Sequence, residues 1–216
     1  IGYTMSYRAV HLDHHRYFGD PSRDPDYVSY AAYPKSRVGF ILWLLRHLSG
    51  SAAVRQFLSL LHSKRDATRL SSARGTGLIL TQALFVVIFW GAFGTPFAYL
   101  LWIVPLVTVA KTLSATRTFC EHGSSNGRPV LRTITGSRLD TVMMGSFGFD
   151  QHAAHHLYPT IPFSSLPEVD LKHVDAIRNG LGRELVGVSY ERFGGGHFRL
   201  LFSWLKQLPW FERERP

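Results

Sequence analysis

The sequence predicts an all-α integral membrane protein with a transmembrane hairpin at residues 74–113. The first observation is a run of 36 residues, Gly75 to Ala110, that contains no charged side chain. As a single helix this run would be about 54 Å long, nearly twice the hydrocarbon thickness of a bilayer. The second observation is the break at Gly94-Thr95-Pro96 in the middle of the run, which favours two spans joined by a short turn.

The two expected spans run roughly from Arg74 to Phe93 and from Pro96 to Leu113. Pro105 lies inside the second span and can kink it, which membrane helices tolerate when neighbouring groups satisfy the backbone. The alternative is a buried helical pair of a soluble protein. Soluble cores rarely need two consecutive spans of membrane length, so the hairpin is the favoured interpretation.

Basic residues flank the uncharged run on both sides: Arg55, Lys64, Arg65, Arg69 and Arg74 before it, and Lys111, Arg117, Arg128, Arg132 and Arg138 after it. The positive-inside rule then places both flanks in the cytoplasm, including the C-terminal part at 114–216. A nucleic-acid partner is disfavoured because the basic residues behind the net charge of +9 lie on both sides of an apolar block, whereas nucleic-acid binding favours basic residues on one helix or strand face. Anionic lipid headgroups or an acidic electron-donor protein fit this charge distribution.

Two further stretches have the pattern of interfacial helices. Val38 to Leu45 is apolar but too short to span, and a mixed helix is expected to continue from it to about His62. Near the C-terminus five apolar residues recur at helical spacing: Phe198, Leu201, Phe202, Leu205 and Leu208. This second helix either lies half-immersed in the membrane surface or packs against the protein's own cytoplasmic part.

Seven of the 11 histidines are candidate metal ligands. The spacing H-x-x-H-H occurs twice, in an N-terminal motif (His11, His14, His15) and a C-terminal motif (His152, His155, His156). On a helix each motif presents three imidazoles on one face. Imidazole suits iron, zinc and copper, and six or more ligands exceed the needs of one tetrahedral zinc. The motifs therefore predict two metal ions held between helices.

His122 is a seventh candidate, because it follows the second span and can point back toward the site. Its neighbour Glu121 is a ligand, a carboxylate that orients an imidazole, or a surface acid. Cys120 is the only cysteine, which excludes an internal disulfide framework and any cysteine-based zinc or iron–sulfur site.

Other polar residues carry weaker signals. Asp13 lies within the N-terminal motif and Asp150 just before the C-terminal motif, and each either orients an imidazole or is solvated. Asp24-Pro25-Asp26 is expected to form a turn that can also brace the histidine helix. The isolated residues His47, His62, His173 and His197 are expected to be ordinary surface or interfacial histidines.

These motifs resemble those of a known family. The N-terminal motif, followed by Gly19-Asp20 and Asp24-Pro25-Asp26, resembles the second histidine box of membrane fatty acid desaturases. The C-terminal motif, continuing through Leu157-Tyr158-Pro159, resembles their third box. Glu121-His122-Gly123 is similar to a histidine element that desaturases and the related alkane hydroxylases carry after the last span. The resemblance covers roughly residues 5 to 170.

The resemblance implies two non-haem iron ions that activate O₂ and abstract hydrogen from a fatty acyl chain. It implies an external electron donor as well, such as a ferredoxin, a cytochrome b5-like domain or a rubredoxin. No residue beyond the metal ligands is expected to be catalytic, and no organic cofactor site is expected. The family's first box, H-x-x-x-H or H-x-x-x-x-H, has no counterpart here. Since the chain begins at Ile1 just before the N-terminal motif, residues 1–216 are expected to form one N-terminally incomplete domain.

Three alternative functions remain open at this point. A hydroxylase or ketolase acting on fatty acids, alkanes or carotenoids shares the first hydrogen abstraction with a desaturase. A zinc-dependent membrane hydrolase would use about three histidines to polarise water and would leave four of the seven unexplained. A non-catalytic membrane scaffold gives no reason for either motif.

Overall fold

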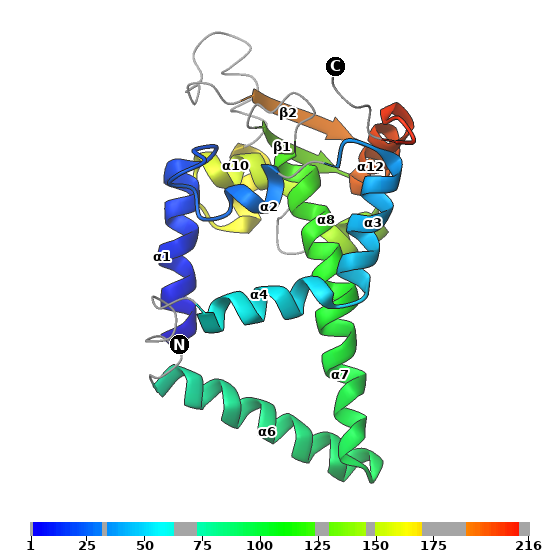
Figure 1. The fold of residues 1–216 in the computed structure, drawn as a ribbon. Coiled ribbons are helices and arrows are strands. Elements are labelled where there is room, and N and C mark those ends of the chain that lie inside the picture. The colour runs from blue at the N-terminus through cyan, green and yellow to red at the C-terminus, as the bar shows by residue number, and fades with distance from the viewer. Residues whose placement is uncertain are drawn as a thin grey trace. The chain divides into compact units, whose positions relative to one another are not determined.

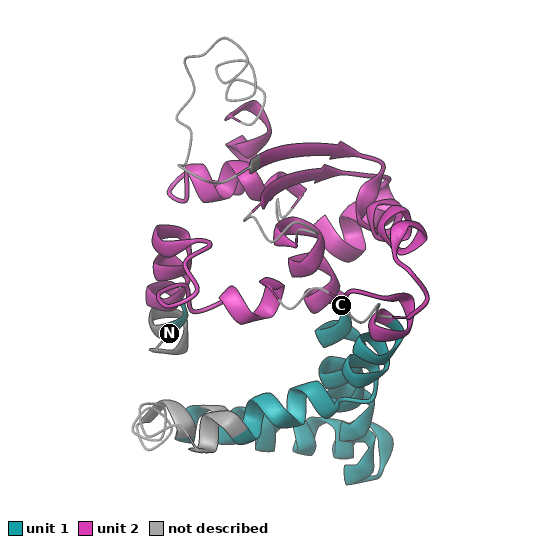
Figure 2. Cartoon of the chain, turned by 45° about the horizontal axis from the view of Figure 1, so that its top comes forward, with its two compact units in different colours: residues 1–7, 41–112 teal, residues 8–40, 113–216 magenta. Residues whose placement is uncertain are grey.

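The computed structural model describes residues 2–31, 34–62, 73–123, 130–145, 150–169 and 189–211, which are mostly helical (Figure 1). The chain divides into two compact units (Figure 2). Unit 1 contains residues 1–7 and 41–112, and unit 2 contains residues 8–40 and 113–216.

Unit 1 contains the two apolar helical segments that the uncharged run predicts. Helix α6 (Ala73–Phe93) ends at Gly94, whose φ of 73° lies in the left-handed region that favours glycine. Thr95 then caps the next segment, because its side chain accepts a hydrogen bond from the amide of Phe97. That segment consists of the 3₁₀ turn η1 (Pro96–Tyr99), helix α7 (Leu100–Pro105) and the π-helical turn η2 (Leu106–Ala110). The predicted break at Gly94-Thr95-Pro96 is confirmed.

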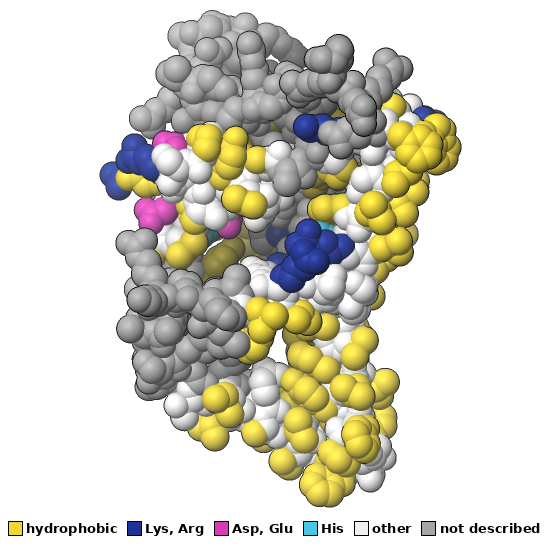
Figure 3. Space-filling model, in the orientation of Figure 1, with side chains coloured by type: hydrophobic (Ala, Val, Ile, Leu, Met, Phe, Trp, Pro, Cys, Tyr) yellow, Lys and Arg dark blue, Asp and Glu magenta, His cyan; other side chains and the backbone are white. Residues whose placement is uncertain are grey.

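The two apolar segments contact each other near this turn. The Tyr99 hydroxyl donates a hydrogen bond of 2.5 Å to Oε1 of Gln82 on α6. The rings of Phe85 and Trp102 lie with their centroids 5.4 Å apart. Elsewhere α6 and α7 carry exposed apolar side chains, which cover much of their surface on the face drawn in Figure 3.

The second segment is longer than the sequence predicts. Helix α8 (Lys111–His122) continues α7 and η2, so the helical run extends from Pro96 to His122 rather than ending at Leu113. Pro105 is followed at once by the π-helical turn, which is how the chain accommodates the missing amide donor. Among the described residues, Pro96–His122 is the one helix long and apolar enough to cross a membrane by length and composition. The apolar part of α6, Ile79–Phe93, is shorter.

The expected mixed helix reaching His62 is two helices. Helix α3 (Arg37–Leu48) stops before Gly50, and α4 (Ser51–His62) begins after it. Gly50 has a φ of 76°, a conformation that ends a helix and that a side chain would strain. The sequence-based prediction overlooked this glycine as a helix terminator.

Unit 2 contains a short parallel sheet of two strands. Strand β1 (Val130–Thr135) pairs with β2 (Ser189–Gly194), in a register that places Val130 opposite Ser189. Helix α10 (His152–Leu157) and helix α12 (Gly196–Gln207) both contact β1 (Figure 1). The other described elements of unit 2 are the C-terminal part of α1 (Gly2–Tyr17), α2 (Tyr27–Ala31), residues 37–40 of α3, residues 113–122 of α8, α9 (Arg138–Asp140), the π-helical turn η3 (Thr141–Gly145) and the 3₁₀ turn η5 (Phe163–Ser165).

The sheet corrects the all-α prediction: the protein is mostly helical, not entirely so. Val130–Thr135 is rich in β-branched residues, and Val130 to Ile134 are all buried. Six residues give too short a pattern to distinguish a buried strand from a helical segment. The partner strand also comes more than 50 residues later in the chain, so no local hairpin signal announces the pairing.

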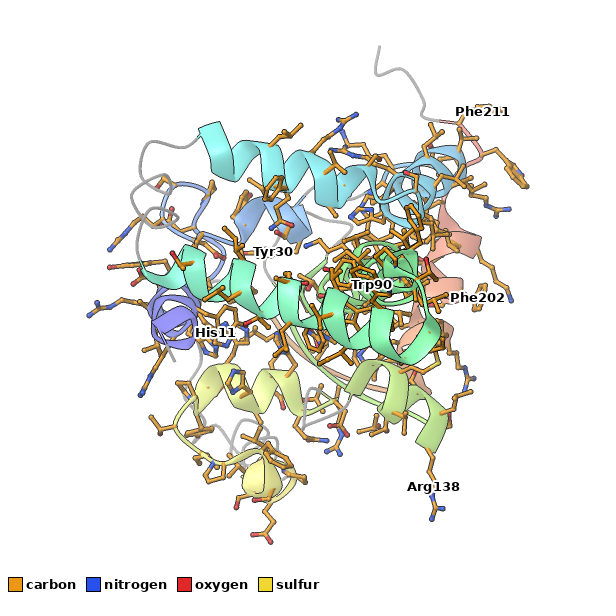
Figure 4. The ribbon with its side chains drawn as sticks, turned by 90° about the horizontal axis from the view of Figure 1, so that it is seen from below. His11, Tyr30, Trp90, Arg138, Phe202 and Phe211 are labelled. Atoms are coloured by element: carbon orange, nitrogen blue, oxygen red, sulfur yellow. The ribbon has the colours of Figure 1, made fainter. Side chains whose placement is uncertain are left out.

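Helix α12 packs against its own unit through one face. Leu200 and Leu201 are buried, and the ring of Trp204 meets Phe119 of α8 edge-on at 5.2 Å. Phe202, one of the apolar residues of the predicted stripe, is 60% exposed and points outward (Figure 4). Of the two alternatives for this helix, packing against the protein is therefore confirmed for its inner face.

Candidate metal centre

All seven candidate ligands lie in unit 2. Residues 11, 14 and 15 lie on α1, residue 122 ends α8, and residues 152, 155 and 156 lie on α10. The structure groups six of them into two triads, within each of which the ligand atoms lie within 4.8 Å of one another. Triad 1 is His11, His15 and His155, and triad 2 is His14, His122 and His156. Each triad thus combines residues from both sequence motifs.

Triad 1 is half-buried and its three Nε2 atoms converge. Nε2 of His11, the residue labelled in Figure 4, lies 3.1 Å from Nε2 of His15 and 3.1 Å from Nε2 of His155. One ring nitrogen of a neutral imidazole cannot satisfy both contacts with a single proton or lone pair. A central cation does satisfy them, since metal–nitrogen bonds of about 2.1 Å at right angles separate neighbouring nitrogens by about 3 Å.

Triad 2 is fully buried. His156 is 6% exposed, and its Nε2 has no hydrogen-bond partner among the described residues. His152 adjoins this triad, with its Nε2 2.7 Å from Nε2 of His122. A buried polar nitrogen without a partner is costly, so triad 2 also fits an ion.

The Nδ1 atoms of three histidines are directed to acceptor oxygens that are not ligand atoms of the triads. Nδ1 of His14 lies 2.8 Å from a carboxylate oxygen of Asp24. Nδ1 of His15 lies 3.4 Å from the His156 carbonyl, and Nδ1 of His122 lies 3.4 Å from the Val130 carbonyl. Each acceptor fixes the proton on Nδ1, so the Nε2 lone pair is left to face the triad, as metal-binding histidines require.

Asp24 is the centre of a buried hydrogen-bond network. Its side chain accepts from His14, from the Tyr30 hydroxyl and from the amides of Gly19 and Asp26. Burial raises the pKa of Asp24, but these hydrogen bonds outweigh burial and hold the pKa below its usual value. The predicted turn at Asp24-Pro25-Asp26 therefore also braces the histidine helix. Tyr30 was not singled out in the sequence, where nothing distinguishes it from the other tyrosines.

The structure explains why glutamate and glycine stand on either side of His122. Glu121 is 1% exposed, which excludes the surface-acid alternative, and its carboxylate lies 3.6 Å from Nδ1 of His152 and 3.5 Å from Nε of Arg117. Glu121 is not a member of either triad. A Cβ at Gly123 would overlap the carbonyl oxygen of Phe119, so only glycine fits there.

Four histidines of the site, His15, His152, His155 and His156, are neutral at physiological pH because their pKa values lie below the usual value. Burial and the neighbouring His11 lower the pKa of His15 to about 3 and that of His155 to about 4. Burial also lowers the pKa of His152 and His156 well below the usual value, with further lowering from adjacent imidazoles. Neutral imidazole is the form that binds metal ions.

The other polar residues flagged in the sequence lie outside the triads. Asp13 is exposed and Asp150 is half-buried. His47 is half-buried on α3, with Nδ1 2.8 Å from the Trp43 carbonyl. His173 lies outside the described residues, as does the side chain of His62.

The prediction of a surface histidine is wrong for His197. This residue is fully buried, and its Nδ1 and its amide both lie 2.9 Å from the Asp140 carboxylate. A lone histidine beside Gly194-Gly195-Gly196 gives no sequence signal for a partner 57 residues away.

A mostly helical protein whose unit 2 gathers seven histidines from three helices, six of them in two adjacent triads, has the arrangement of a histidine-rich metal-binding protein. Residues 2–183 match the fatty acid desaturase family, and the chain belongs to that family. The two triads are consistent with the metal site typical of the family.

The chain is also similar to a dihydrorhizobitoxine desaturase from Bradyrhizobium elkanii, with 28% identity over 179 residues. That match covers 73% of this chain and 50% of the relative, so the chain spans about half the length of the curated relative it matches. No solved structure matches.

Proposed function

We propose that the full-length protein is an O₂-dependent di-iron oxidoreductase that introduces a double bond into a fatty acyl chain at the membrane. The observation that carries this proposal is the pair of adjacent histidine triads, each built from both sequence motifs, in a chain of the desaturase family. One tetrahedral zinc ion would use one triad and leave the other unexplained, which favours the redox function over a zinc hydrolase.

The residues present fit two iron ions. The proposed ligands are His11, His14, His15, His122, His152, His155 and His156. Bound there, the irons would supply activation of O₂ and removal of hydrogen from an unactivated C–H bond. The protein's own contribution is positional: Asp24 and the carbonyls of His156 and Val130 hold the Nδ1 protons, which directs each Nε2 inward.

The proposed location is an integral, multi-pass membrane protein with its active site on the cytoplasmic face. Residues 74–113 would form the transmembrane hairpin and residues 114–216 the cytoplasmic C-terminal part of one desaturase-like domain. The turn at Gly94, the apolar surface of α6 and the length of Pro96–His122 support this location. The basic residues on both flanks of the hairpin favour the cytoplasmic side for both motifs.

The substrate and the electron source complete the proposal. The name of the Bradyrhizobium relative gives dihydrorhizobitoxine as its substrate, so a smaller substrate is the second candidate beside a lipid acyl chain. The two electrons that reduce O₂ would come from a separate ferredoxin, cytochrome b5-like domain or rubredoxin. The net charge of +9 favours an acidic donor.

The test is product analysis with the full-length protein, reconstituted with iron, O₂ and a reduced donor. Mass spectrometry of an acyl substrate should show the loss of two hydrogens, whereas the gain of one oxygen would instead support a hydroxylase. Product formed without O₂ and reductant, or a preparation that holds one zinc and no iron when iron is supplied, would refute the proposal. His47→Ala, a histidine outside both triads, is the matched control for His155→Ala, which should abolish turnover.

A further inference from the structure

The end of helix α8 is held by a buried guanidinium. Arg132 on β1 is 5% exposed, and its Nη1 donates hydrogen bonds of 2.9 Å to the carbonyl of Cys120 and 2.5 Å to the carbonyl of Gly123. The last carbonyls of a helix have no partner within the helix, and they form the negative end of its dipole. A cation in this place satisfies both requirements at once.

The guanidinium is itself fixed from two other directions. Its Nε lies 2.6 Å from the carboxylate of Glu191, which is opposite Arg132 in the register of the parallel strands. Its carbon lies 4.8 Å from the centre of the Trp204 ring on α12. Hydrogen-bond acceptors and an aromatic ring therefore hold this buried guanidinium in one position. A side chain fixed in this way can in turn fix the position of the backbone carbonyls that it binds.

What Arg132 binds is the helical turn that carries a member of triad 2. His122 lies between Cys120 and Gly123, and its Nδ1 is 3.4 Å from the carbonyl of Val130. Val130 is two residues before Arg132 on the same strand, so β1 contacts both the imidazole and the backbone on either side of it.

We propose that Arg132 is a positioning residue for His122. By closing the last turn of α8 it aims Nε2 of His122 at triad 2, and the sheet formed with β2 serves to hold this arginine in place. The proposal rests on the proposed function in one respect only, namely that His122 binds a metal ion.

The experiment is a cobalt(II) titration of the full-length protein, followed by visible absorption, in which the two ions give two binding steps. Arg132→Gln removes the cation. Arg132→Lys keeps the charge but replaces the planar fork by a single ammonium group that cannot reproduce the set of contacts. Arg138→Gln is the matched control, because Arg138 is exposed and points away from unit 2 (Figure 4).

Both Arg132 variants should weaken one of the two cobalt steps by roughly 10–100-fold, the usual cost of losing a group that orients a metal ligand. The other step should stay within about twofold of wild type, and Arg138→Gln should change neither. Wild-type binding of both ions by Arg132→Lys would overturn the proposal. So would equal weakening of both steps in parallel with a lower melting temperature, because that pattern indicates a general loss of stability. A wild-type protein that takes up only one ion would refute the proposed two-iron function, and unchanged binding of that ion by Arg132→Lys would then refute this inference as well.

Discussion

Nδ1 of His14 lies 2.8 Å from Oδ1 of Asp24, and both side chains are buried. The second carboxylate oxygen of Asp24 accepts hydrogen bonds from the Tyr30 hydroxyl and the Gly19 amide. The carboxylate therefore has donors on both sides, and its negative charge faces the imidazole that completes triad 2. This is the arrangement by which a carboxylate fixes the orientation of a metal-binding histidine.

Replacing Asp24 by Asn should weaken binding of one metal ion by roughly 10–100-fold. An amide can still accept from His14, but its NH₂ group would then face the hydroxyl of Tyr30 and the amide of Gly19, which are both donors in the native network. Metal analysis after dialysis against graded chelator measures the effect. Asp13→Asn is the control, because it introduces the same substitution at an exposed residue of the same motif. Equal retention of metal by the two variants would show that Asp24 does not support the site.

The division of each motif between two triads predicts that adjacent histidines serve different ions. His155→Ala should remove one ion and leave the other, and His156→Ala should do the reverse, because these residues belong to triads 1 and 2 respectively. Cobalt(II) spectra of the two variants should therefore differ from each other, and their sum should approximate the wild-type spectrum. His47→Ala should match wild type. Loss of the same ion in both variants would contradict the assignment.

The metal-free fold should lose stability as the pH falls below about 6.5. Burial lowers the pKa of His15 to about 3 and that of His155 to about 4 in the native state, against 6.5 when unfolded. At a pH between 6.5 and these lower pKa values, the two imidazoles are protonated in the unfolded chain but neutral in the folded chain. Acidification therefore favours unfolding. Thermal melting of metal-free protein at pH 8, 6.5 and 5 should show a falling melting temperature. A melting temperature that rises with acidification would have the wrong sign.

Gly123→Ala should displace the end of α8 and reduce metal uptake by triad 2, because the new Cβ would overlap the Phe119 carbonyl. The melting temperature and the metal content should both decrease. Gly91→Ala on α6 is the matched control, since a Cβ there meets nothing within 4 Å. Alanine favours a helix over glycine by about 1 kcal/mol, so the control should be neutral or slightly stabilised.

The proposed topology predicts that the turn at Thr95 and the site lie on opposite faces of the membrane. Single cysteines at Thr95 and at the exposed Ser164, in a Cys120→Ser background, can be labelled in sealed vesicles with an impermeant thiol reagent. Labelling from opposite faces is expected. Labelling of both positions from the same face would rule out a single passage of the chain between them.

The parts of the site that depend on local sequence were predictable. The H-x-x-H-H spacing places three imidazoles on one helix face, and Gly94-Thr95-Pro96 marks the end of an apolar helix. The parts that depend on distant contacts were not. The assignment of His14 and His15 to different triads requires the orientation of α1 against α10, which no spacing encodes. The role of Arg132 depends on a strand whose partner lies more than 50 residues away in the chain. In the sequence, nothing distinguishes Arg132 from the other basic residues that follow the apolar run.

The interleaving of the two motifs also constrains when an ion can be bound. Neither motif alone supplies a complete triad, since triad 1 needs His155 and triad 2 needs both His122 and His156. During synthesis the N-terminal motif is therefore exposed long before it can hold a metal ion with its full set of ligands. Loading of either triad would therefore follow translation of α10, and each proposed ion would join segments about 140 residues apart in the chain, as a cross-link that a chelator could remove.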